Sequence, residues 1–161
     1  MTAEPKPTVY IETTIPSYLT AWSSRDLIRA AEQQLTKEWW EVRDRYELRI
    51  STYVVRECEA GDPEAADARM KSLDDIPIFA PSDQGDLLAE QLMLGVPLPP
   101  VASVDASHIA SAAVGRCRYL LTWNCTHIAN ATLRSKIEAI CRQMGYEPPI
   151  ICTPKELLGA T

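Results

Sequence analysis

The sequence lacks any apolar run close to the roughly 18 residues that a membrane-spanning helix needs. Its first ten residues, MTAEPKPTVY, lack the basic start and long apolar stretch of a secretory signal peptide. Internal repeats and low-complexity tracts are also absent from its 161 residues. We therefore expect one domain, residues 1–161, that has no membrane span and stays in the cytosol.

The sequence has little of what a zinc site or a disulfide framework requires. It contains two histidines, neither at zinc-finger spacing, and an odd number of cysteines with no CxxC pair. Four of the cysteines lie in apolar strand or helix contexts, where cysteine acts as a small hydrophobic residue. The five are Cys58, Cys117, Cys125, Cys141 and Cys152.

Basic residues are in deficit, with 16 Lys and Arg against 22 Asp and Glu and a net charge of −6. This argues against a protein that coats nucleic acid through a broad basic face. It does not exclude an enzyme whose acids bind cations and whose few basic residues cluster locally. The carboxyl-terminal third has basic residues that could flank a phosphate backbone, although ordinary solvated charge is the simpler explanation for them. These are Arg116, Arg118, Arg134, Lys136 and Arg142.

Hydrophobic periodicity and capping residues predict strands that alternate with helices. The expected strands are 9–11, 48–51, 76–79, 119–123 and 150–152. The expected helices are 13–19, 26–46 with a capping-box-like start at Ser23 and Asp26, 53–60, 63–73, 82–94, 103–114, 131–144 and a turn from 153. This alternation predicts a three-layer α/β/α sandwich around a mainly parallel five-stranded sheet, with right-handed crossovers. Chemistry in such folds takes place at the carboxyl edge of the sheet.

Four segments bring oxygen-bearing side chains toward that edge. Glu12 ends the first strand, Glu57 lies in the helix after the second, and Asp105 lies in the first turn of the helix that precedes the fourth. Asn124 ends the fourth strand. Mg²⁺ and Mn²⁺ prefer such oxygens, and a bound cation offsets the repulsion between clustered carboxylates. The pattern therefore predicts a shared metal site.

Each acid also has a simpler explanation. Asp105 is favourable against the dipole of its helix, and Glu57 could lie on a solvated helix face. Glu59 is a second acid on the same helix but points elsewhere by helical periodicity. Glu12 is the hardest to explain in this way, because a charge that ends a central strand is costly without a partner.

The histidines and tryptophans are less informative. His108 lies three residues after Asp105, so it could orient that acid or touch a substrate, although a structural role is more common for such a histidine. His127 is expected to be a capping or surface residue. Trp39 belongs to the core stripe of the long helix, whereas Trp40 could mark an interface.

Five segments together resemble the PIN-domain family, and most closely its VapC-like toxins. VYIETT is similar to the family's opening of an apolar triplet followed by Asp-Thr-Ser, and STYVVREC to its second segment, which contains a Glu. VDASHIASAA is similar to the third segment, Asp-Ala-x-His-Ile-Ala, and YLLTWN to the fourth, which ends in Thr-x-Asp. PIICTPKELL is similar to the final strand and Thr-Pro-Glu-Glu-Leu ending. The resemblance spans essentially the whole chain, in order.

The resemblance implies a Mg²⁺- or Mn²⁺-dependent endoribonuclease that is the toxin of a type II toxin–antitoxin pair. It implies an RNA substrate, a cognate antitoxin and a homodimer, with the long helix that bears the two tryptophans as one possible interface. By position, Glu12, Glu57 and Asp105 are the first three acids and metal ligands, and Asn124 takes the fourth place. Thr13 and Thr122 match the hydroxyl positions beside the first and fourth acids, and His108 supports the site.

Two departures from the family pattern matter. Glu12 replaces the usual Asp and moves its carboxylate by more than an ångström. Asn124 replaces the fourth acid and removes a negative charge, although its carbonyl oxygen can still coordinate. The alternative is therefore a catalytically degenerate PIN-fold module that binds RNA or protein. A receiver-like signalling domain is a third, weaker alternative, because the first strand ends in one Glu and Ala80-Pro81 follows the third.

Overall fold

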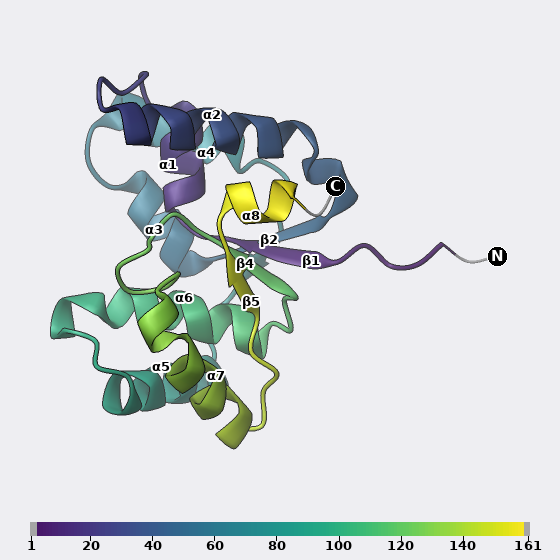
Figure 1. Cartoon of the computed structure of the whole chain (residues 1–161), viewed down its shortest axis with the longest axis vertical. Coiled ribbons are helices and arrows are strands. Elements are labelled where there is room, and N and C mark those ends of the chain that lie inside the picture. Colours follow the sequence, from purple (N-terminus) through teal and green to yellow (C-terminus); the bar gives the residue numbers. More distant parts are fainter. Residues whose placement is uncertain (1–2, 160–161) are drawn as a thin grey trace.

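The computed structural model describes residues 3–159; residues 1–2 and 160–161 of the predicted domain lie outside the described part. Its centre is a five-stranded sheet in the order β3-β2-β1-β4-β5 (Figure 1). Every neighbouring pair is parallel. The strands are β1 (Thr8–Ile11), β2 (Glu47–Ser51), β3 (Ile78–Phe79), β4 (Tyr119–Leu121) and β5 (Ile150–Cys152).

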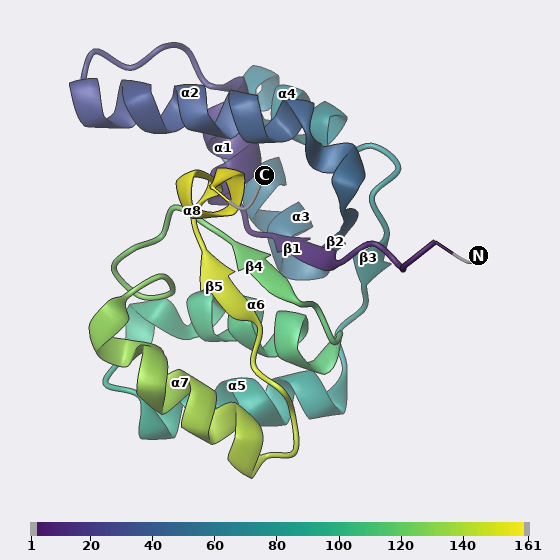
Figure 2. The same ribbon diagram turned by 45° about the vertical axis from the view of Figure 1, so that its right-hand side comes forward.

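Helices cover both faces of this sheet and complete the predicted three-layer sandwich. Helices α1, α2, α4 and α8 lie on one side, and α5, α6 and α7 lie on the other (Figures 1 and 2). Helix α3 directly follows β2 and packs against both α4 and α6. The helices of the described residues are α1 (Thr14–Thr20), α2 (Leu27–Glu41), α3 (Thr52–Glu59), α4 (Pro63–Ser72), α5 (Asp83–Gly95), α6 (Ser103–Val114), α7 (Ala131–Gln143) and α8 (Pro154–Leu158), with short 3-10 helices at Arg43–Arg45 and Pro100–Ala102. None of them is long and apolar enough to cross a membrane.

The strand order reverses at β1, which is the position where open α/β sheets place a crevice at their carboxyl edge. Strands β2 and β3 lie to one side of β1, and β4 and β5 lie to the other. A receiver domain has the order 2-1-3-4-5, so this order excludes the receiver-like alternative. The segments that follow β1 and β4 leave the sheet side by side at the point of reversal, because those strands are hydrogen-bonded neighbours.

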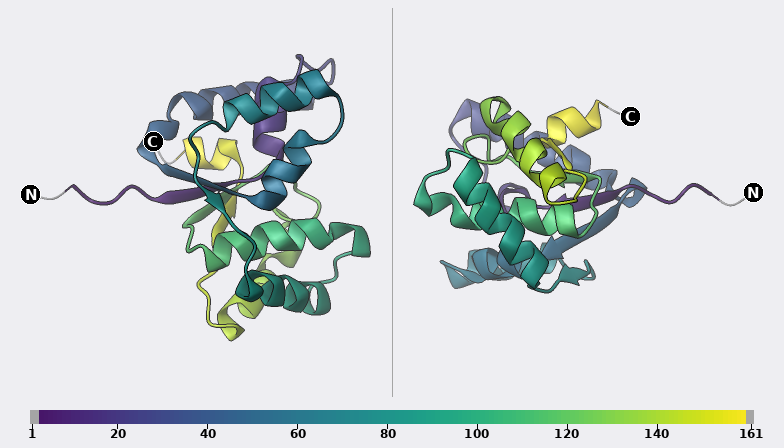
Figure 3. Two further views of the ribbon diagram at one scale, coloured as in Figure 1. Left: turned by 180° about the vertical axis from the view of Figure 1, so that it is seen from behind. Right: turned by 90° about the horizontal axis from the view of Figure 1, so that it is seen from below.

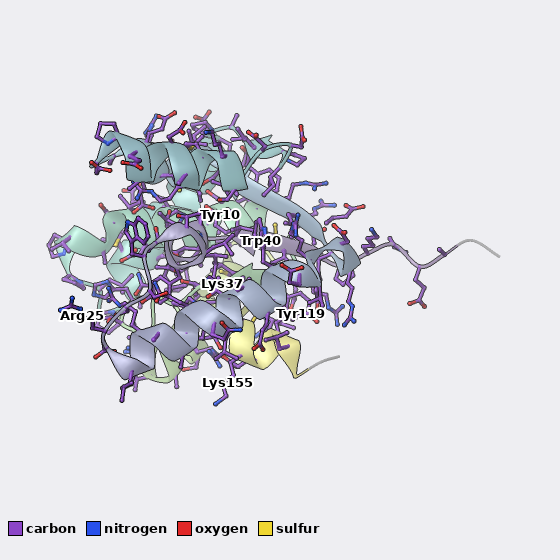
Figure 4. The ribbon with its side chains drawn as sticks, turned by 90° about the horizontal axis from the view of Figure 1, so that it is seen from above. Tyr10, Arg25, Lys37, Trp40, Tyr119 and Lys155 are labelled. Atoms are coloured by element: carbon purple, nitrogen blue, oxygen red, sulfur yellow. The ribbon has the colours of Figure 1, made fainter. Side chains whose placement is uncertain are left out.

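The core explains why β1 is central. All three residues of Val9–Ile11 are fully buried, as expected for a strand covered on both faces. Trp39 is fully buried, which confirms its place in the core stripe of α2. Trp40 is half-buried, packs against the core, and lies under the Arg43 guanidinium at 4.9 Å from the ring centre. Figure 4 labels Trp40 and the fully buried Tyr10 in a view from above.

Three predicted boundaries were too long. The helix predicted to reach residue 46 ends at Glu41, because Val42 leaves helical geometry at φ −106° and ψ 9°. The fourth strand ends at Leu121 instead of Trp123, because the Trp123 amide donates to the Thr14 hydroxyl and not to a strand. The third strand is confined to Ile78–Phe79 at the sheet edge.

The caps and cysteines agree in part with the prediction. Helix α2 begins after Asp26, whose carboxylate accepts from the Arg29 amide, whereas Ser23 makes no capping bond. All five cysteines are free thiols; Cys125 is exposed and the other four are buried. Burial raises the pKa of the buried thiols, to about 11 or about 12, which makes them unreactive.

Candidate active site at the carboxyl edge of the sheet

Glu12 lies directly after the central strand and is 3% exposed. One of its carboxylate oxygens, Oε2, accepts three hydrogen bonds. The Thr14 amide donates at 2.9 Å, the Thr14 hydroxyl at 2.6 Å and the Thr122 hydroxyl at 2.9 Å. Burial raises the pKa of Glu12, while His108 and the threonine donors partly oppose the rise. The fold therefore keeps a carboxylate in a place where its charge is costly.

The threonines around Glu12 fix the two segments that leave β1 and β4. The Thr14 hydroxyl accepts from the Trp123 amide at 2.8 Å, and the Thr122 hydroxyl accepts from the Asn124 amide at 2.9 Å. Thr14 therefore has the role beside the first acid that the sequence analysis assigned to Thr13. The sequence offered one sign of this contact, a threonine two residues after Glu12, because threonine hydroxyls often bond to groups nearby in the chain.

Glu57 is held from two sides. The Thr13 hydroxyl donates to its Oε1 at 2.7 Å, and His108 Nε2 is hydrogen-bonded to the same oxygen. Thr13 is thus part of the site, but it serves the second acid. Partial burial tends to raise the pKa of Glu57, but the hydrogen bond and charge of His108 outweigh it, and the net pKa is lowered. Glu57 is therefore an anion held in a fixed direction.

A buried chain of hydrogen bonds continues from Glu57 into the core. His108 is fully buried, and its Nδ1 lies 2.7 Å from the Tyr10 hydroxyl, which lies 2.6 Å from the Ser51 hydroxyl. An ionised Glu57 only accepts, so Nε2 carries a proton toward it. His108 Nδ1, the Tyr10 hydroxyl and the Ser51 hydroxyl continue the chain from there. The chain joins β1, β2, α3 and α6.

The expectation that His108 could orient Asp105 is therefore wrong, because the acid that His108 contacts is Glu57. His108 lies on the face of α6 that packs into the core, and it contacts Glu57 instead. Asp105 stands three residues earlier and lies toward the segment after β4. A shared helix face made the pairing plausible, but a fully buried histidine takes whichever polar groups the core presents to it.

Asp105 belongs to a second group, which includes a histidine that the sequence analysis set aside. Its Oδ1 accepts from Asn124 Nδ2 at 3.1 Å, and its Oδ2 lies 2.9 Å from His127 Nδ1. Asn124 Oδ1 also accepts from the His127 amide at 3.0 Å. The expectation that His127 is a cap or surface residue is wrong, because the turn that begins at Asn124 folds its ring back onto Asp105.

The two groups form one site. Asn124 joins them, because its backbone amide donates to the Thr122 hydroxyl and its side-chain amide donates to Asp105. Among residues 3–159, no Lys or Arg lies within salt-bridge distance of Glu12, Glu57 or Asp105. The only imidazoles paired with these acids are those described above. Of the basic residues of the carboxyl-terminal third, Arg142 pairs with Glu138 and Glu147.

Carboxylate oxygens are the donors that Mg²⁺ and Mn²⁺ prefer, and the three predicted ligands Glu12, Glu57 and Asp105 differ in how many of their oxygens are already hydrogen-bonded. Glu12 Oε1 and Glu57 Oε2 accept no hydrogen bond from the described residues, whereas both oxygens of Asp105 are engaged. Within residues 3–159, no three acids, histidines or cysteines are close enough to enclose an ion. Mg²⁺ keeps several waters, so two carboxylates can bind it. Each Asp105 oxygen accepts one hydrogen bond and keeps a further lone pair, so this acid can join them without losing its partners.

Asn124 offers a direct test of this arrangement. We expect Asn124→Asp to lower Tm by about 2–4 °C in chelator, because it replaces a hydrogen bond of about 1 kcal/mol with two facing carboxylates. Mn²⁺ should then raise the Tm of this variant more than that of the wild type, because the ion binds only the folded state. Thermal unfolding with and without Mn²⁺ measures both effects. Equal Mn²⁺ shifts in the two proteins would contradict the expectation.

Comparisons with known proteins bear on the fold. No family model and no curated protein sequence matches the chain. Among solved structures, it is similar to a chain in the crystal structure of VapBC2 from Rickettsia felis bound to a DNA fragment from their promoter. The TM-score is 0.55 and the sequence identity 12%, over 91% of this chain and 98% of that one. At this identity the similarity establishes a shared three-layer fold with that VapBC2 chain.

Proposed function

We propose that this protein is a divalent-metal-dependent endoribonuclease, the toxin of a type II toxin–antitoxin pair. The observation that supports the proposal best is Glu12, a buried carboxylate at the reversal point of the sheet. It has three hydrogen-bond donors but no basic partner among the described residues. Glu57 and Asp105 lie on the two helices that border it. Such an excess of carboxylates is what a site for a cation and a phosphodiester requires.

Each residue has a distinct part in the proposed mechanism. Glu12 and Glu57 would hold the ion together with water, and Asp105 is the third acid. When bound, the ion would lower the pKa of a water and stabilise the leaving oxygen of an RNA phosphodiester. Thr122 fixes the direction of Glu12, while Thr13 and His108 fix that of Glu57.

The loop side of the site has a positioning role. Asn124 and His127 hold the Asp105 carboxylate from both oxygens. Thr122 and Asn124 remain the groups we assign to water or substrate. Because the Asp105 carboxylate is already held in the free protein, its side chain does not have to be ordered when the substrate binds.

The proposal includes a cognate antitoxin, an RNA substrate, a homodimer and a cytosolic location. The five free thiols agree with a reducing compartment. The amino-terminal end of α2 leaves apolar side chains uncovered, with Leu27 at 85% and Ile28 at 73% exposure. Fully buried Trp39 cannot form a protein interface, so a partner on this helix would contact the exposed residues instead.

A second candidate is a PIN-fold module that binds RNA or protein without cleaving it. Two observations favour it: an amide at position 124 where the family pattern has an acid, and the hydrogen bonds that both Asp105 oxygens already accept. Calorimetry separates the two candidates, because the module predicts no Mg²⁺ or Mn²⁺ binding.

The metal dependence of cleavage is the main test of the nuclease. We expect purified protein to cleave a structured RNA with Mn²⁺ or Mg²⁺, to stop on addition of a chelator, and to resume when Mn²⁺ is in excess. Gel analysis of end-labelled RNA measures this. Glu59→Gln, on an exposed position of α3, should cleave at the wild-type rate. Cleavage that continues unchanged in chelator would contradict the proposal.

A further inference from the structure

A pocket lies between α3, α6 and the segment that joins β3 to α5, on the same two helices that carry Glu57 and Asp105. It is a pocket of about 220 Å³, small compared with the roughly 300–1,000 Å³ of most ligand sites. Figure 3, left, shows this segment leaving the edge of the sheet and running past α6 to α5. The residues that matter in it are Tyr53, Phe79, Asp86, Ser107, Ser111 and Val114.

We propose that this pocket binds a single nucleobase with adjacent N–H donors on its edge, which among the RNA bases is guanine. The proposal rests on the ribonuclease function for its biological meaning, but base binding in the pocket can be measured without cleavage. Its volume suits one flat ring system and not a complete nucleotide.

The walls of the pocket are apolar and fixed. The Tyr53 ring packs edge-on to the buried His108 ring at a centroid distance of 6.4 Å, and Val114 contributes aliphatic surface from α6. Phe79 lies so close to Gly115 that a Cβ there would come within 2.5 Å of its ring. Aromatic rings that are held in place in this way are the platforms on which single-stranded nucleic acids stack their bases.

The polar groups of the pocket have acceptors to offer. The Ser107 and Ser111 hydroxyls donate to the Ser103 and Ser107 carbonyls at 3.2 Å and 2.7 Å, so their protons are used and their lone pairs remain. Asp86 Oδ1 accepts from the Tyr53 hydroxyl at 3.3 Å, and its Oδ2 accepts no bond from the described residues.

The hydrogen-bond acceptors of the pocket determine which base fits it. Guanine presents N1–H and N2–H₂ side by side on its Watson–Crick edge, and a carboxylate can accept from both. Adenine and cytosine each place an acceptor beside their single amino group, and uracil places its one N–H between two carbonyls. The other three bases would therefore set an acceptor against Asp86 or leave it unpaired, which is the costly case.

The pocket also lies at a suitable distance from the acids. Tyr53 and Glu57 are four residues apart on α3, so they share a helix face and are separated by about 6 Å along its axis. Arg56 is exposed, and its guanidinium lies over the Tyr53 ring at 6.0 Å, where it can meet a phosphate. A base in the pocket would thus place its own backbone next to Glu57.

Mononucleotide titration tests the proposal in chelator, with GMP, AMP, CMP and UMP as probes and two-dimensional NMR as the measurement. We expect GMP to shift the resonances of Tyr53 and Ser111 and to bind at least tenfold more tightly than AMP. Asp86→Asn should abolish this preference, because its amide donates where the carboxylate accepts. Asp83→Asn, an exposed position three residues earlier on α5, should keep it.

Three outcomes would overturn the proposal: no shift with GMP, equal binding of all four nucleotides, or displacement of GMP by N-acetyl-arginine amide. The last would identify the pocket as a site for a partner's arginine, since a guanidinium also presents only donors. Because the titration needs no metal, an inactive nuclease leaves its result intact. If the protein cleaves RNA, the cuts should lie beside guanines and lose that preference in Asp86→Asn.

Discussion

Replacement of Asp105 by alanine should reduce RNA cleavage roughly 10³-fold, equivalent to about 4 kcal/mol of transition-state stabilisation. The substitution removes the third carboxylate and also releases the two groups that it holds, Asn124 and His127. Initial rates with saturating Mn²⁺, normalised to folded protein by circular dichroism, give the measurement.

Two further variants separate chemistry from loop anchoring. Asp105→Asn keeps the size of the side chain, and it should lose nearly as much activity as alanine if the charge takes part in the reaction. His127→Ala removes only the anchor, so its loss should be smaller. Asp83→Ala, which removes an exposed acid in the first turn of α5, is the control and should be fully active. Equal activity of wild type and Asp105→Ala would show that the cleavage comes from a contaminant.

Glu12→Gln should abolish cleavage and at the same time stabilise the fold. The amide oxygen of glutamine has two lone pairs for the donors that surround Glu12 Oε2, and the buried charge disappears. Because burial disfavours the ionised form of Glu12, removal of the charge should raise Tm at pH 7, by about 2–4 °C for each kcal/mol gained at this length. Differential scanning calorimetry in chelator provides the measurement.

Glu57→Gln should change Tm in the opposite direction. Burial raises the pKa of Glu12, so the protonated form of Glu12 favours the folded state. This contribution is present at low pH and is lost as pH rises through the pKa of Glu12 in the folded protein. The net pKa of Glu57 is lowered by His108, so Glu57 contributes stability above its ordinary pKa, and this is lost as pH falls. At pH 7, Glu57→Gln should therefore lower Tm. A lower Tm in Glu12→Gln would contradict this account of the buried charge.

The fold could be predicted because periodic patterns encode it. Alternating strands and helices gave the three-layer architecture, and the fully buried Val9–Ile11 strand was recognisable from its residues alone. The carboxyl ends of β1 and β4 had to lie at the same edge once the sheet was parallel. That is why Glu12 and Asn124 could be placed at one edge from the sequence.

The contacts within the site could not be predicted in the same way. His127 reaches Asp105 because of the path of a non-helical turn, and periodicity carries no information about such a path. His108 turned out to bind Glu57, whose relation to α6 depends on how two helices pack. Thr14 replaced Thr13 beside Glu12 because adjacent residues in a tight turn point in different directions.

The buried hydrogen-bond chain gives Tyr10 two structural roles, and a substitution at this position affects both. It fills the centre of the sheet and, through His108, sets the direction of an acid at the molecular surface. Phenylalanine would keep the volume but would leave the imidazole nitrogen without its partner. A repacking of the interior that preserves every apolar contact can therefore still misalign the surface acid. In this protein, one side chain couples the packing of the interior to the direction of Glu57.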